Sequence, residues 1–253
     1  MPLSDEQLNH YRDQGFVNAG QLFKHDELTR MAVEFDRLVN FDEQVLGNKE
    51  DGVFPYRAML NFRSPDLADF ILHPAFVEVA RQILGEDIRF WWDQGINKAP
   101  GSGSPIAWHQ DNGYQDGRTQ EFLTCWLALD ASSIKNGGLE VIPGSAAKGA
   151  REHEWQGVHA VIPEPLLPEG VPTPLDARAG DLLFFSSRLV HRTGGNSSRA
   201  DQRRAWVVQY CRADHVNEIT GESYDNRPWV LRDGEYAKTL TSERPFDLGR
   251  ERP

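Results

Sequence analysis

Residues 88–92 read Ile-Arg-Phe-Trp-Trp, and at this stretch the hydrophobic period of the chain changes. A short run rich in aromatic and β-branched residues indicates a β-strand. Further runs of this kind follow, separated by segments rich in Gly, Pro, Ser and Asn: 106–111, 122–129, 139–142, 158–162, 182–185 and 204–211. Many short strands joined by turn-rich segments predict a β-sandwich or barrel.

The residues before this stretch show the period of helices. Ser4 and Gln7 match a capping box, which predicts a short helix that ends before Gly15. Further helices are expected over 26–40, from Pro65 after the capping residue Ser64, and from Pro74 to the residue before Gly85. Helices first and strands later predict an α+β protein, mainly β, with the helices packed on one side of a β core.

The length of 253 residues suits one domain with a core of its own. We expect a single domain over residues 1–253. Its parts are a mostly helical N-terminal part (1–86), a β core (87–212) and a C-terminal extension (213–253) whose polar end is peripheral.

The charge of the chain bears on its partners and compartment. The formal net charge is -11, which argues against broad nucleic-acid binding and against adhesion to anionic membranes. The N-terminus is polar, and no apolar run approaches the roughly 20 residues of a membrane helix. Cys125 and Cys211 lie in apolar runs and are expected to be buried, reduced thiols. These features predict a cytoplasmic protein without nucleic-acid or membrane partners, and they leave its oligomeric state open.

The segment Trp108-His109-Gln110-Asp111 contains two potential metal ligands. On a strand, residues two apart point to the same face, so His109 and Asp111 would point into the core together. His191 is the best-placed third ligand, because it follows an apolar strand and precedes a glycine-rich turn. Two histidines and one carboxylate with open coordination positions are the arrangement used for non-haem Fe(II) and O2.

A second group of residues follows the third histidine. Arg203 and Arg204 open the strand at 204–211, and a guanidinium can hold a carboxylate through two parallel hydrogen bonds. Thr193 can add a hydroxyl hydrogen bond to the same carboxylate. Each signal is weak alone, because a single His-x-Asp pair or two adjacent arginines often lie solvated at a surface.

The ordered set of motifs is specific. It comprises His109-x-Asp111, then Asn136-Gly137-Gly138-Leu139-x-Val141-Ile142-Pro143-Gly144-Ser145, Gly180-Asp181-x-Leu183-x-Phe185, His191 and Arg203-Arg204-Ala205, with Ile96-Asn97-Lys98 upstream. In this order the motifs resemble the phytanoyl-CoA dioxygenase family. The resemblance covers about residues 3–210.

The resemblance implies a double-stranded β-helix, also called a jelly-roll or cupin-like core, with the N-terminal helices packed outside. It implies Fe(II), the co-substrate 2-oxoglutarate and O2, with succinate and CO2 as products. His109, Asp111 and His191 match the family's iron ligands. The carboxylate at Asp111 argues for hydroxylation or another oxidation and against halogenation, since related halogenases have a small residue there.

The resemblance also assigns residues to 2-oxoglutarate. Arg203 matches the arginine that holds the distal carboxylate, with Arg204 as the alternative because the spacing after His191 is one residue longer than expected. The other co-substrate residues by position are Thr193, Trp126, Gln94 and Arg57. Candidates for the substrate pocket are Tyr56, Trp92 and Tyr114.

Two other functions use the same residues. A zinc-dependent hydrolase or isomerase also suits two histidines and a carboxylate, but it leaves Thr193 and Arg203 without a task. A non-catalytic jelly-roll that binds a carboxylate would not need all three metal ligands. The prime substrate is open, and the lack of a strong basic cluster for coenzyme A favours a smaller metabolite.

Overall fold

The computed structural model describes residues 2–45, 56–101, 105–115 and 119–245.

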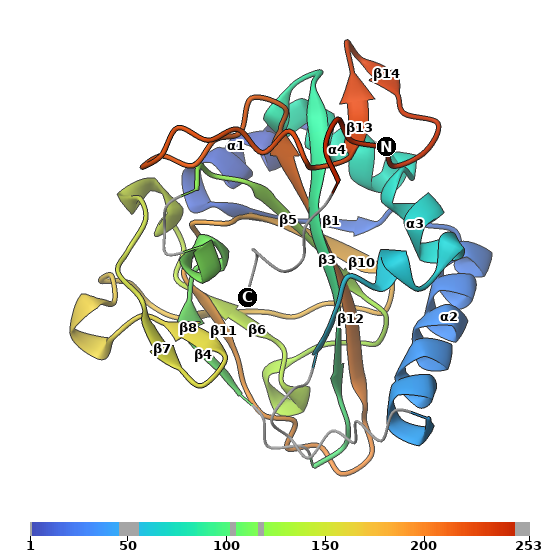
Figure 1. The fold of residues 1–253 in the computed structure, drawn as a ribbon. Helices are drawn as coiled ribbons and strands as arrows, with labels where there is room; N and C mark the ends of the chain where they lie inside the picture. The colour runs from blue at the N-terminus through green and yellow to red at the C-terminus, as the bar shows by residue number, and fades with distance from the viewer. Residues whose placement is uncertain (1, 46–55, 102–104, 116–118, 246–253) are drawn as a thin grey trace.

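 At Glu43, Tyr56 and Arg57 the structure describes the backbone alone. The longer strands gather into two facing sheets, with the helices outside them (Figure 1). Within the described residues the helices are α1 (Asp5–Gln14), α2 (His25–Gln44), α3 (Pro65–Ile71) and α4 (Pro74–Leu84), with the short 3-10 turns η1 (Leu60–Phe62), η2 (Asp111–Gln115), η3 (Ile134–Asn136), η4 (Ala146–Lys148) and η5 (Glu164–Leu166).

The larger sheet is antiparallel throughout. Its strands in spatial order are β1 (Phe16–Gln21), β10 (Asp181–Ser186), β5 (Leu123–Ala128), β12 (Arg203–Arg212), β3 (Ile88–Lys98), β13 (Trp229–Arg232) and β14 (Glu235–Tyr236), and β2 (Tyr56–Ala58) pairs with β3. The smaller sheet has the order β4 (Ile106–His109), β11 (His191–Thr193), β6 (Leu139–Val141) and β9 (Thr173–Leu175), and a hairpin joins β7 (Glu154–Gln156) to β8 (His159–Val161). Two facing antiparallel sheets with helices on one side confirm the expected jelly-roll core and the α+β, mainly β class.

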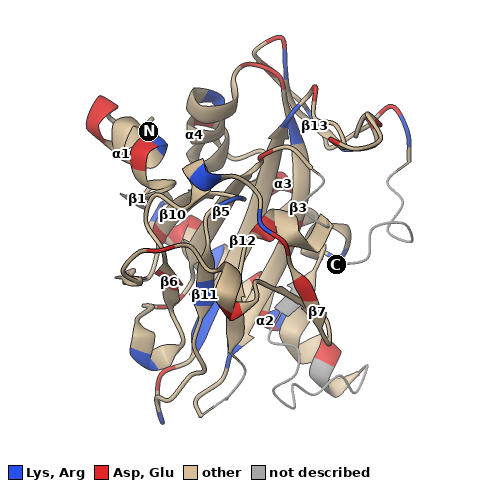
Figure 2. Ribbon diagram, turned by 90° about the vertical axis from the view of Figure 1, so that its left-hand side faces the viewer, with Lys and Arg blue, Asp and Glu red and all other residues tan. Residues whose placement is uncertain are grey.

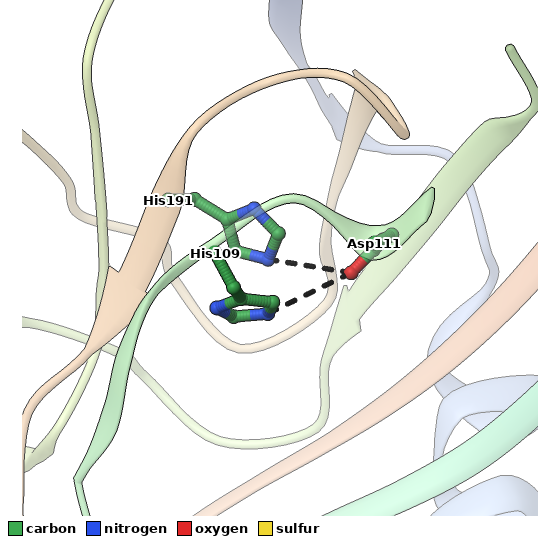
Figure 3. A group of neighbouring side chains, drawn as sticks. All are labelled: His109, Asp111 and His191. Atoms are coloured by element: carbon green, nitrogen blue, oxygen red, sulfur yellow. Dashed lines mark ion pairs between the residues drawn. The ribbon is translucent and has the colours of Figure 1, made fainter. Parts of the chain in front are cut away.

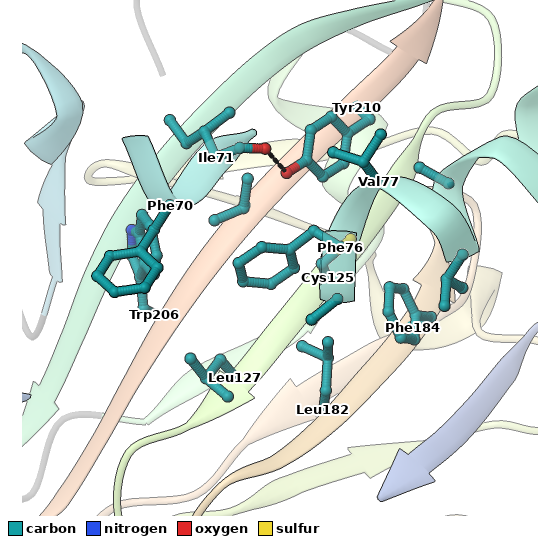
Figure 4. Packing of buried hydrophobic residues seen from close by; sticks show 14 of the residues in the cluster. Phe70, Ile71, Phe76, Val77, Cys125, Leu127, Leu182, Phe184, Trp206 and Tyr210 are labelled. Atoms are coloured by element: carbon teal, nitrogen blue, oxygen red, sulfur yellow. Dashed lines mark hydrogen bonds between the residues drawn. The ribbon is translucent and has the colours of Figure 1, made fainter. Parts of the chain in front are cut away.

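The central strands of the larger sheet are covered on both faces. Every residue of β5 and of β10 is buried, which explains why their sequences read as continuous apolar runs. Side chains on one face, such as Cys125 and Phe184, pack against Phe76 of α4 (Figure 4). Side chains on the other face, such as Trp126 and Leu183, point between the two sheets. Burying a side chain of this size contributes roughly 1.5–3 kcal/mol.

The helices begin and end at the residues that the sequence marks. Ser4 and Gln7 form the capping box of α1, and Gly15 ends that helix in the left-handed conformation with φ 85°. The Ser64 hydroxyl accepts the backbone N–H of Leu67 at the start of α3. The helices expected over 26–40 and from Pro74 are also present, the former extended to His25–Gln44.

Two expectations about strands are wrong. The N-terminal part contains strands β1 and β2, which join the larger sheet through β10 and β3 and were not expected in a helical region. Their short runs carry no clear alternation, and long-range pairing decides their conformation. The strand expected over 106–111 ends at His109, and Asp111 opens the 3-10 turn η2.

Charged residues of both signs are interspersed along the elements in view in Figure 2. Cys125 and Cys211 are both free and buried, as expected. Among the described helices, none combines the length and the apolar character that a membrane span requires.

Candidate active site

His109, Asp111 and His191 lie together between the two sheets (Figure 3). His109 is the last residue of β4, His191 is the first residue of β11, and the two are cross-strand partners. The Asp111 oxygen Oδ1 lies 3.8 Å from Nε2 of His109 and 3.5 Å from Nε2 of His191. One ligand atom from each residue lies within 4.8 Å of the others, so a single metal ion can contact all three.

The backbone fixes the orientation of both imidazoles. Nδ1 of His109 lies 2.8 Å from the Ala107 carbonyl, and Nδ1 of His191 lies 3.0 Å from the Leu189 carbonyl. A carbonyl only accepts, so each Nδ1 carries a proton and each Nε2 is the ring nitrogen turned towards the centre. Burial, and secondarily the neighbouring His191, lower the pKa of His109 well below its ordinary value. Neutral imidazoles with a free Nε2 are suitable metal ligands.

Asp111 reaches the site by a route other than strand alternation. Gln110 is fully buried, and its side-chain amide donates to the carbonyls of Gly149 at 3.0 Å and Arg188 at 2.5 Å. These bonds hold the chain as it leaves β4 and turns into η2. Gln110 points away from the two ligands, and the turn η2, in place of a continued strand, brings Asp111 back towards the histidines.

The second oxygen of Asp111 is held by the larger sheet. The Thr124 hydroxyl of β5 donates to Oδ2 at 2.5 Å, and the Gln209 amide of β12 donates to the same oxygen at 3.0 Å. Gln209 also contacts the Thr124 hydroxyl at 3.1 Å. Oδ1 therefore remains the oxygen directed at the metal position. Neither residue was predicted from the sequence, where the only signal is a polar side chain within an otherwise apolar buried strand.

A cavity extends from the three ligands between the sheets. Its walls come from both sheets and from the segment after β12: Trp91, Trp92, Gln94, Ile96, Ile106, His109, Asp111, Tyr114, Gln115, Phe122, Thr124, Trp126, Leu139, Phe185, His191, Thr193, Val207, Gln209 and Arg227. The expected co-substrate residues Gln94, Trp126 and Thr193 are among them, as are the substrate candidates Trp92 and Tyr114. The side chains of Arg57 and Tyr56 lie outside the described part of the structure, although the Arg57 backbone pairs with Gly95 beside Gln94.

The two adjacent arginines of β12 point in opposite directions. Arg203 is fully buried, and its Nη2 donates to the Gly137 carbonyl at 2.7 Å. Its Nε and Nη1 have no hydrogen-bond partner among the residues that the structure describes. Arg204 instead forms ion pairs with Asp130 at 2.7 Å and Asp36 at 2.8 Å on the outer side of the strand. Of the two guanidiniums, only that of Arg203 lies on the cavity side and retains unused donors.

Strand alternation places Arg203 at one end of the cavity. On β12 it shares a face with Val207 and Gln209, which line the cavity. Its guanidinium carbon lies 5.8 Å from the centre of the Trp126 ring. On β11, Thr193 lies two residues beyond His191, a rise of about 6.6–6.8 Å along a strand. That spacing is on the scale of a five-carbon dicarboxylate.

Lys98 lies at the same end, and its role was not recognised in the sequence. It is fully buried at the end of β3, on the face shared with Gln94 and Ile96. Its ammonium donates to the Thr193 hydroxyl at 2.8 Å and to the Gly194 carbonyl. A charged residue at an inward position of an apolar strand was the available signal. Lys98, Thr193 and Arg203 together are called the distal anchor below.

The opposite end of the cavity is aromatic. Trp91 stacks on Phe122 with ring centres 5.2 Å apart, and Tyr114 packs edge-on against His109 at 5.7 Å. The Arg227 guanidinium lies 4.2 Å above the Trp91 ring. Trp91, Trp92, Tyr114 and Phe122 are called the aromatic end below. Trp91, Phe122 and Arg227 were not predicted from the sequence, because they become neighbours only through strand pairing and the return of the segment after β12.

Comparisons with known proteins agree with this geometry. The sequence model of the family described as "Phytanoyl-CoA dioxygenase (PhyH)" matches residues 11–205. A protein of Stutzerimonas stutzeri named probable alpha-ketoglutarate-dependent hypophosphite dioxygenase is 25% identical over 227 residues, covering 83% of this chain and 79% of the relative. The ectoine dioxygenase of Bordetella bronchiseptica is 26% identical over 232 residues, covering 81% and 75%.

A solved structure shares the fold at similar identity. The non-haem alpha-ketoglutarate-dependent carbocyclase SnoK from nogalamycin biosynthesis superposes with a TM-score of 0.71 at 25% identity, covering 85% of this chain and 86% of that chain. The family match spans most of the chain and includes all three metal-facing residues. The resemblance found in the sequence is thereby confirmed, and the chain belongs to the phytanoyl-CoA dioxygenase family.

Proposed function

We propose that this chain is an Fe(II)- and 2-oxoglutarate-dependent dioxygenase that hydroxylates, or otherwise oxidises, a small organic molecule. Iron would be held by His109, Asp111 and His191, and the distal carboxylate of 2-oxoglutarate by the distal anchor. The enzyme class is that of the relatives to which the chain is similar. The cytosol is the proposed compartment, which the two buried free thiols support.

The observation that carries this proposal is the pairing of the metal-facing triad with a buried, unsatisfied guanidinium. Unpaired N–H groups in a protein interior are energetically costly, so buried donors such as Nε and Nη1 of Arg203 point to a missing acceptor. A carboxylate accepts two parallel hydrogen bonds from a guanidinium. A ligand that chelates the metal with one end and carries a carboxylate at the other fits the cavity chemistry.

Each part of the cavity has a defined task in such an enzyme. Bound iron supplies the activation of O2 and the oxidative decarboxylation of 2-oxoglutarate to succinate and CO2. Trp126 lines the cavity between the triad and Arg203, and its indole N–H has no partner within the described part of the chain, so it can donate to the co-substrate. The aromatic end receives the apolar part of the substrate and excludes water from the reacting centre.

A zinc hydrolase or isomerase would use the same three ligands but would have no use for the distal anchor. Two buried cations with unused donors impose a stability cost that such an enzyme would have no reason to retain. A carboxylate-binding protein without a metal would use the anchor but leave three converging ligands idle. The dioxygenase gives both groups a role.

The test is anaerobic addition of Fe(II) and 2-oxoglutarate to the purified protein. A chelate of Fe(II) with a 2-oxo acid gives a weak visible charge-transfer band, which we expect in the wild type. The double variant His109→Ala, Asp111→Ala should lack the band while keeping the thermal unfolding profile of a folded protein. A metallated wild-type protein without the band would rule out 2-oxoglutarate as co-substrate and favour the zinc enzyme.

A further inference from the structure

The backbone N–H of Gln110 lies between two metal-facing residues, His109 and Asp111, and its acceptor is a side chain. The N–H donates to Nε2 of His153 at 3.0 Å, across 43 positions of the chain. Gln110 is fully buried. Because a buried backbone N–H needs an acceptor, the imidazole of His153 satisfies a group that the turn after β4 would otherwise leave unpaired.

The two hydrogen bonds of His153 define where its proton is. Nδ1 lies 2.9 Å from the Arg151 carbonyl, which only accepts, so Nδ1 carries the proton. Nε2 faces the Gln110 N–H, which only donates, so Nε2 supplies the lone pair. The ring is therefore neutral, and burial favours this form because it lowers the pKa of His153. Since its Nε2 lone pair is engaged, His153 is not a fourth metal ligand.

The same ring packs against the turn that carries Asp111. A Cβ atom added at Gly113 would lie 2.4 Å from Cδ2 and Nε2 of His153, so the ring occupies the space in which a side chain would stand. The Gly113 N–H donates to the Gln110 carbonyl at 2.9 Å and so closes the start of η2. His153 thus contacts the chain on both sides of Asp111.

The segment 149–153 also holds the side chain of Gln110. The Gly149 carbonyl accepts from the Gln110 amide at 3.0 Å, and the Arg151 N–H donates to its oxygen at 2.8 Å. These two bonds fix the position of the side chain. The bond to His153 acts on the backbone, because it fixes the plane of the peptide that joins His109 to Gln110.

We propose that His153 is a positioning residue of the metal site: by holding the peptide between His109 and Gln110, it sets the separation of the His109 imidazole and the Asp111 carboxylate. This inference rests on the part of the proposed function that assigns a metal to the triad, and it does not depend on 2-oxoglutarate. It places the control of two metal ligands in a residue that contacts no metal.

The orientation of this peptide matters because the two ligands are two residues apart. Oδ1 of Asp111 lies 3.8 Å from Nε2 of His109, and rotation of the peptide between them would change that distance. A metal site binds tightly when its ligand atoms are already held at their bonding positions by the residues around them. Loss of one such support typically lowers metal affinity roughly 10- to 100-fold.

Two variants separate the hydrogen bond from the packing of the ring. His153→Gln offers a side-chain oxygen as acceptor near the position of Nε2 but removes the ring from Gly113. His153→Phe keeps a ring and has no acceptor. The glutamine variant should bind Co(II) and Zn(II) within about threefold of the wild type, and the phenylalanine variant roughly 10- to 100-fold more weakly. The exposed His25→Phe should behave as the wild type.

The visible absorption of bound Co(II) provides a readout of geometry that is independent of affinity. At saturating Co(II), the bands of His153→Phe should differ from those of the wild type, because the ligand atoms are no longer held in the same positions. The bands of His153→Gln should coincide with those of the wild type. Thermal unfolding shows whether each variant is folded, and a general loss of stability would not shift the bands of the molecules that remain folded.

A measurement on the wild type keeps the inference testable if His153→Phe does not fold. Nitrogen NMR of histidine-labelled protein reports the state of each ring nitrogen during titration with Zn(II). His153 should remain neutral with its proton on Nδ1 throughout, whereas His109 and His191 should acquire the shifts of metal-bound Nε2. A metal-bound or doubly protonated ring at His153 would overturn the inference.

The outcomes also separate this inference from the proposed function. Weaker metal binding and altered Co(II) bands in His153→Phe, with both restored in His153→Gln, support the positioning role. Equal affinities and spectra in the wild type and both variants overturn it, while the dioxygenase assignment stands. If His153→Gln is impaired as much as His153→Phe or more, ring packing is the cause and the inference fails. If the wild type binds neither Co(II) nor Zn(II), the proposed function itself fails.

Discussion

The Thr124 hydroxyl lies 2.5 Å from Oδ2 of Asp111, the oxygen opposite the one that faces the two histidines. The hydrogen bond crosses from β5 of the larger sheet to the turn that follows β4 of the smaller sheet. It fixes the rotation of the carboxylate, so that Oδ1 is presented to the metal position. One threonine thus links the sheet that carries the core to the ligands of the other sheet.

Thr124→Val should weaken metal binding. Valine keeps the shape of the side chain but removes the hydroxyl, which leaves Oδ2 of Asp111 with the Gln209 amide as its remaining partner. Loss of such a supporting bond typically lowers metal affinity roughly 10- to 100-fold. Titration with Co(II) or Zn(II) against a chelating dye measures the effect. Thr124→Ser should restore most of the affinity, and an unchanged affinity in the valine variant would show that Gln209 suffices.

Arg203→Met and Arg204→Met should have opposite phenotypes. The first removes the unsatisfied guanidinium of the distal anchor, so the Kd for 2-oxoglutarate should rise about 100-fold or more while metal affinity stays within about threefold. The second breaks the partly exposed ion pairs with Asp130 and Asp36, and should lower the free energy of unfolding by about 1 kcal/mol with little effect on co-substrate binding. The reverse pattern would assign the anchor to Arg204.

Asp93 should make the protein less stable as the pH rises. Its carboxyl is buried on β3 beside the Trp206 indole N–H, which lies 3.0 Å away, and burial raises its pKa to about 7. Between the unfolded pKa of about 3.9 and this value, the folded state holds a proton that the unfolded state has lost. Its contribution to stability is therefore complete below that window and is lost as the pH rises through it.

Asp93→Asn should flatten this part of the stability profile. The amide keeps an acceptor for Trp206 and carries no charge, so the gain over wild type should grow between pH 5 and about pH 7. Thermal unfolding at a series of pH values measures it, with the exposed Asp176→Asn as the control. A variant whose melting temperature runs parallel to that of wild type at every pH would refute the raised pKa.

Tyr210→Phe should affect stability and leave catalysis unchanged. The Tyr210 hydroxyl donates to the Ile71 carbonyl at 2.6 Å and so joins β12 to the end of α3, on the face of the sheet away from the cavity (Figure 4). Its removal leaves a buried carbonyl without that donor and should cost about 1–3 kcal/mol. Chemical denaturation measures the loss. A change in the KM for 2-oxoglutarate would instead reveal coupling across the sheet.

The sequence predicted the parts of the fold that local chemistry determines. The capping box at Ser4 and the helix that starts after Ser64 depend on contacts within four residues, and both are present. The inward strands were visible because burial on both faces makes them apolar throughout. The strand β1 was missed because its partners on β10 lie 160 or more positions away in the chain, where no local pattern can indicate the pairing.

The same distinction applies to the site. The residues that meet at the metal position were found from their types and order, although the strand expected to carry Asp111 ends two residues earlier. Arg203 and Arg204 point in opposite directions, as alternation along a strand requires, and the spacing after His191 alone could not choose between them. The partners Lys98, Thr124 and Gln209 were not found, because a hydrogen bond between side chains on different strands depends on register. The contribution of Arg57 to 2-oxoglutarate binding stays a prediction.

The two ends of the cavity differ in how many of their residues stand on paired strands. The distal anchor stands on β3, β11 and β12, where any change also alters the pairing of the sheets. At the aromatic end, Trp91 and Trp92 also stand on β3, but Tyr114 comes from the turn η2, and the neighbouring Arg227 comes from the segment after β12, outside the paired strands. Mutations in these segments can therefore change which substrate binds while the metal ligands and the distal anchor stay the same. Descendants of one ancestral enzyme can in this way come to oxidise different substrates.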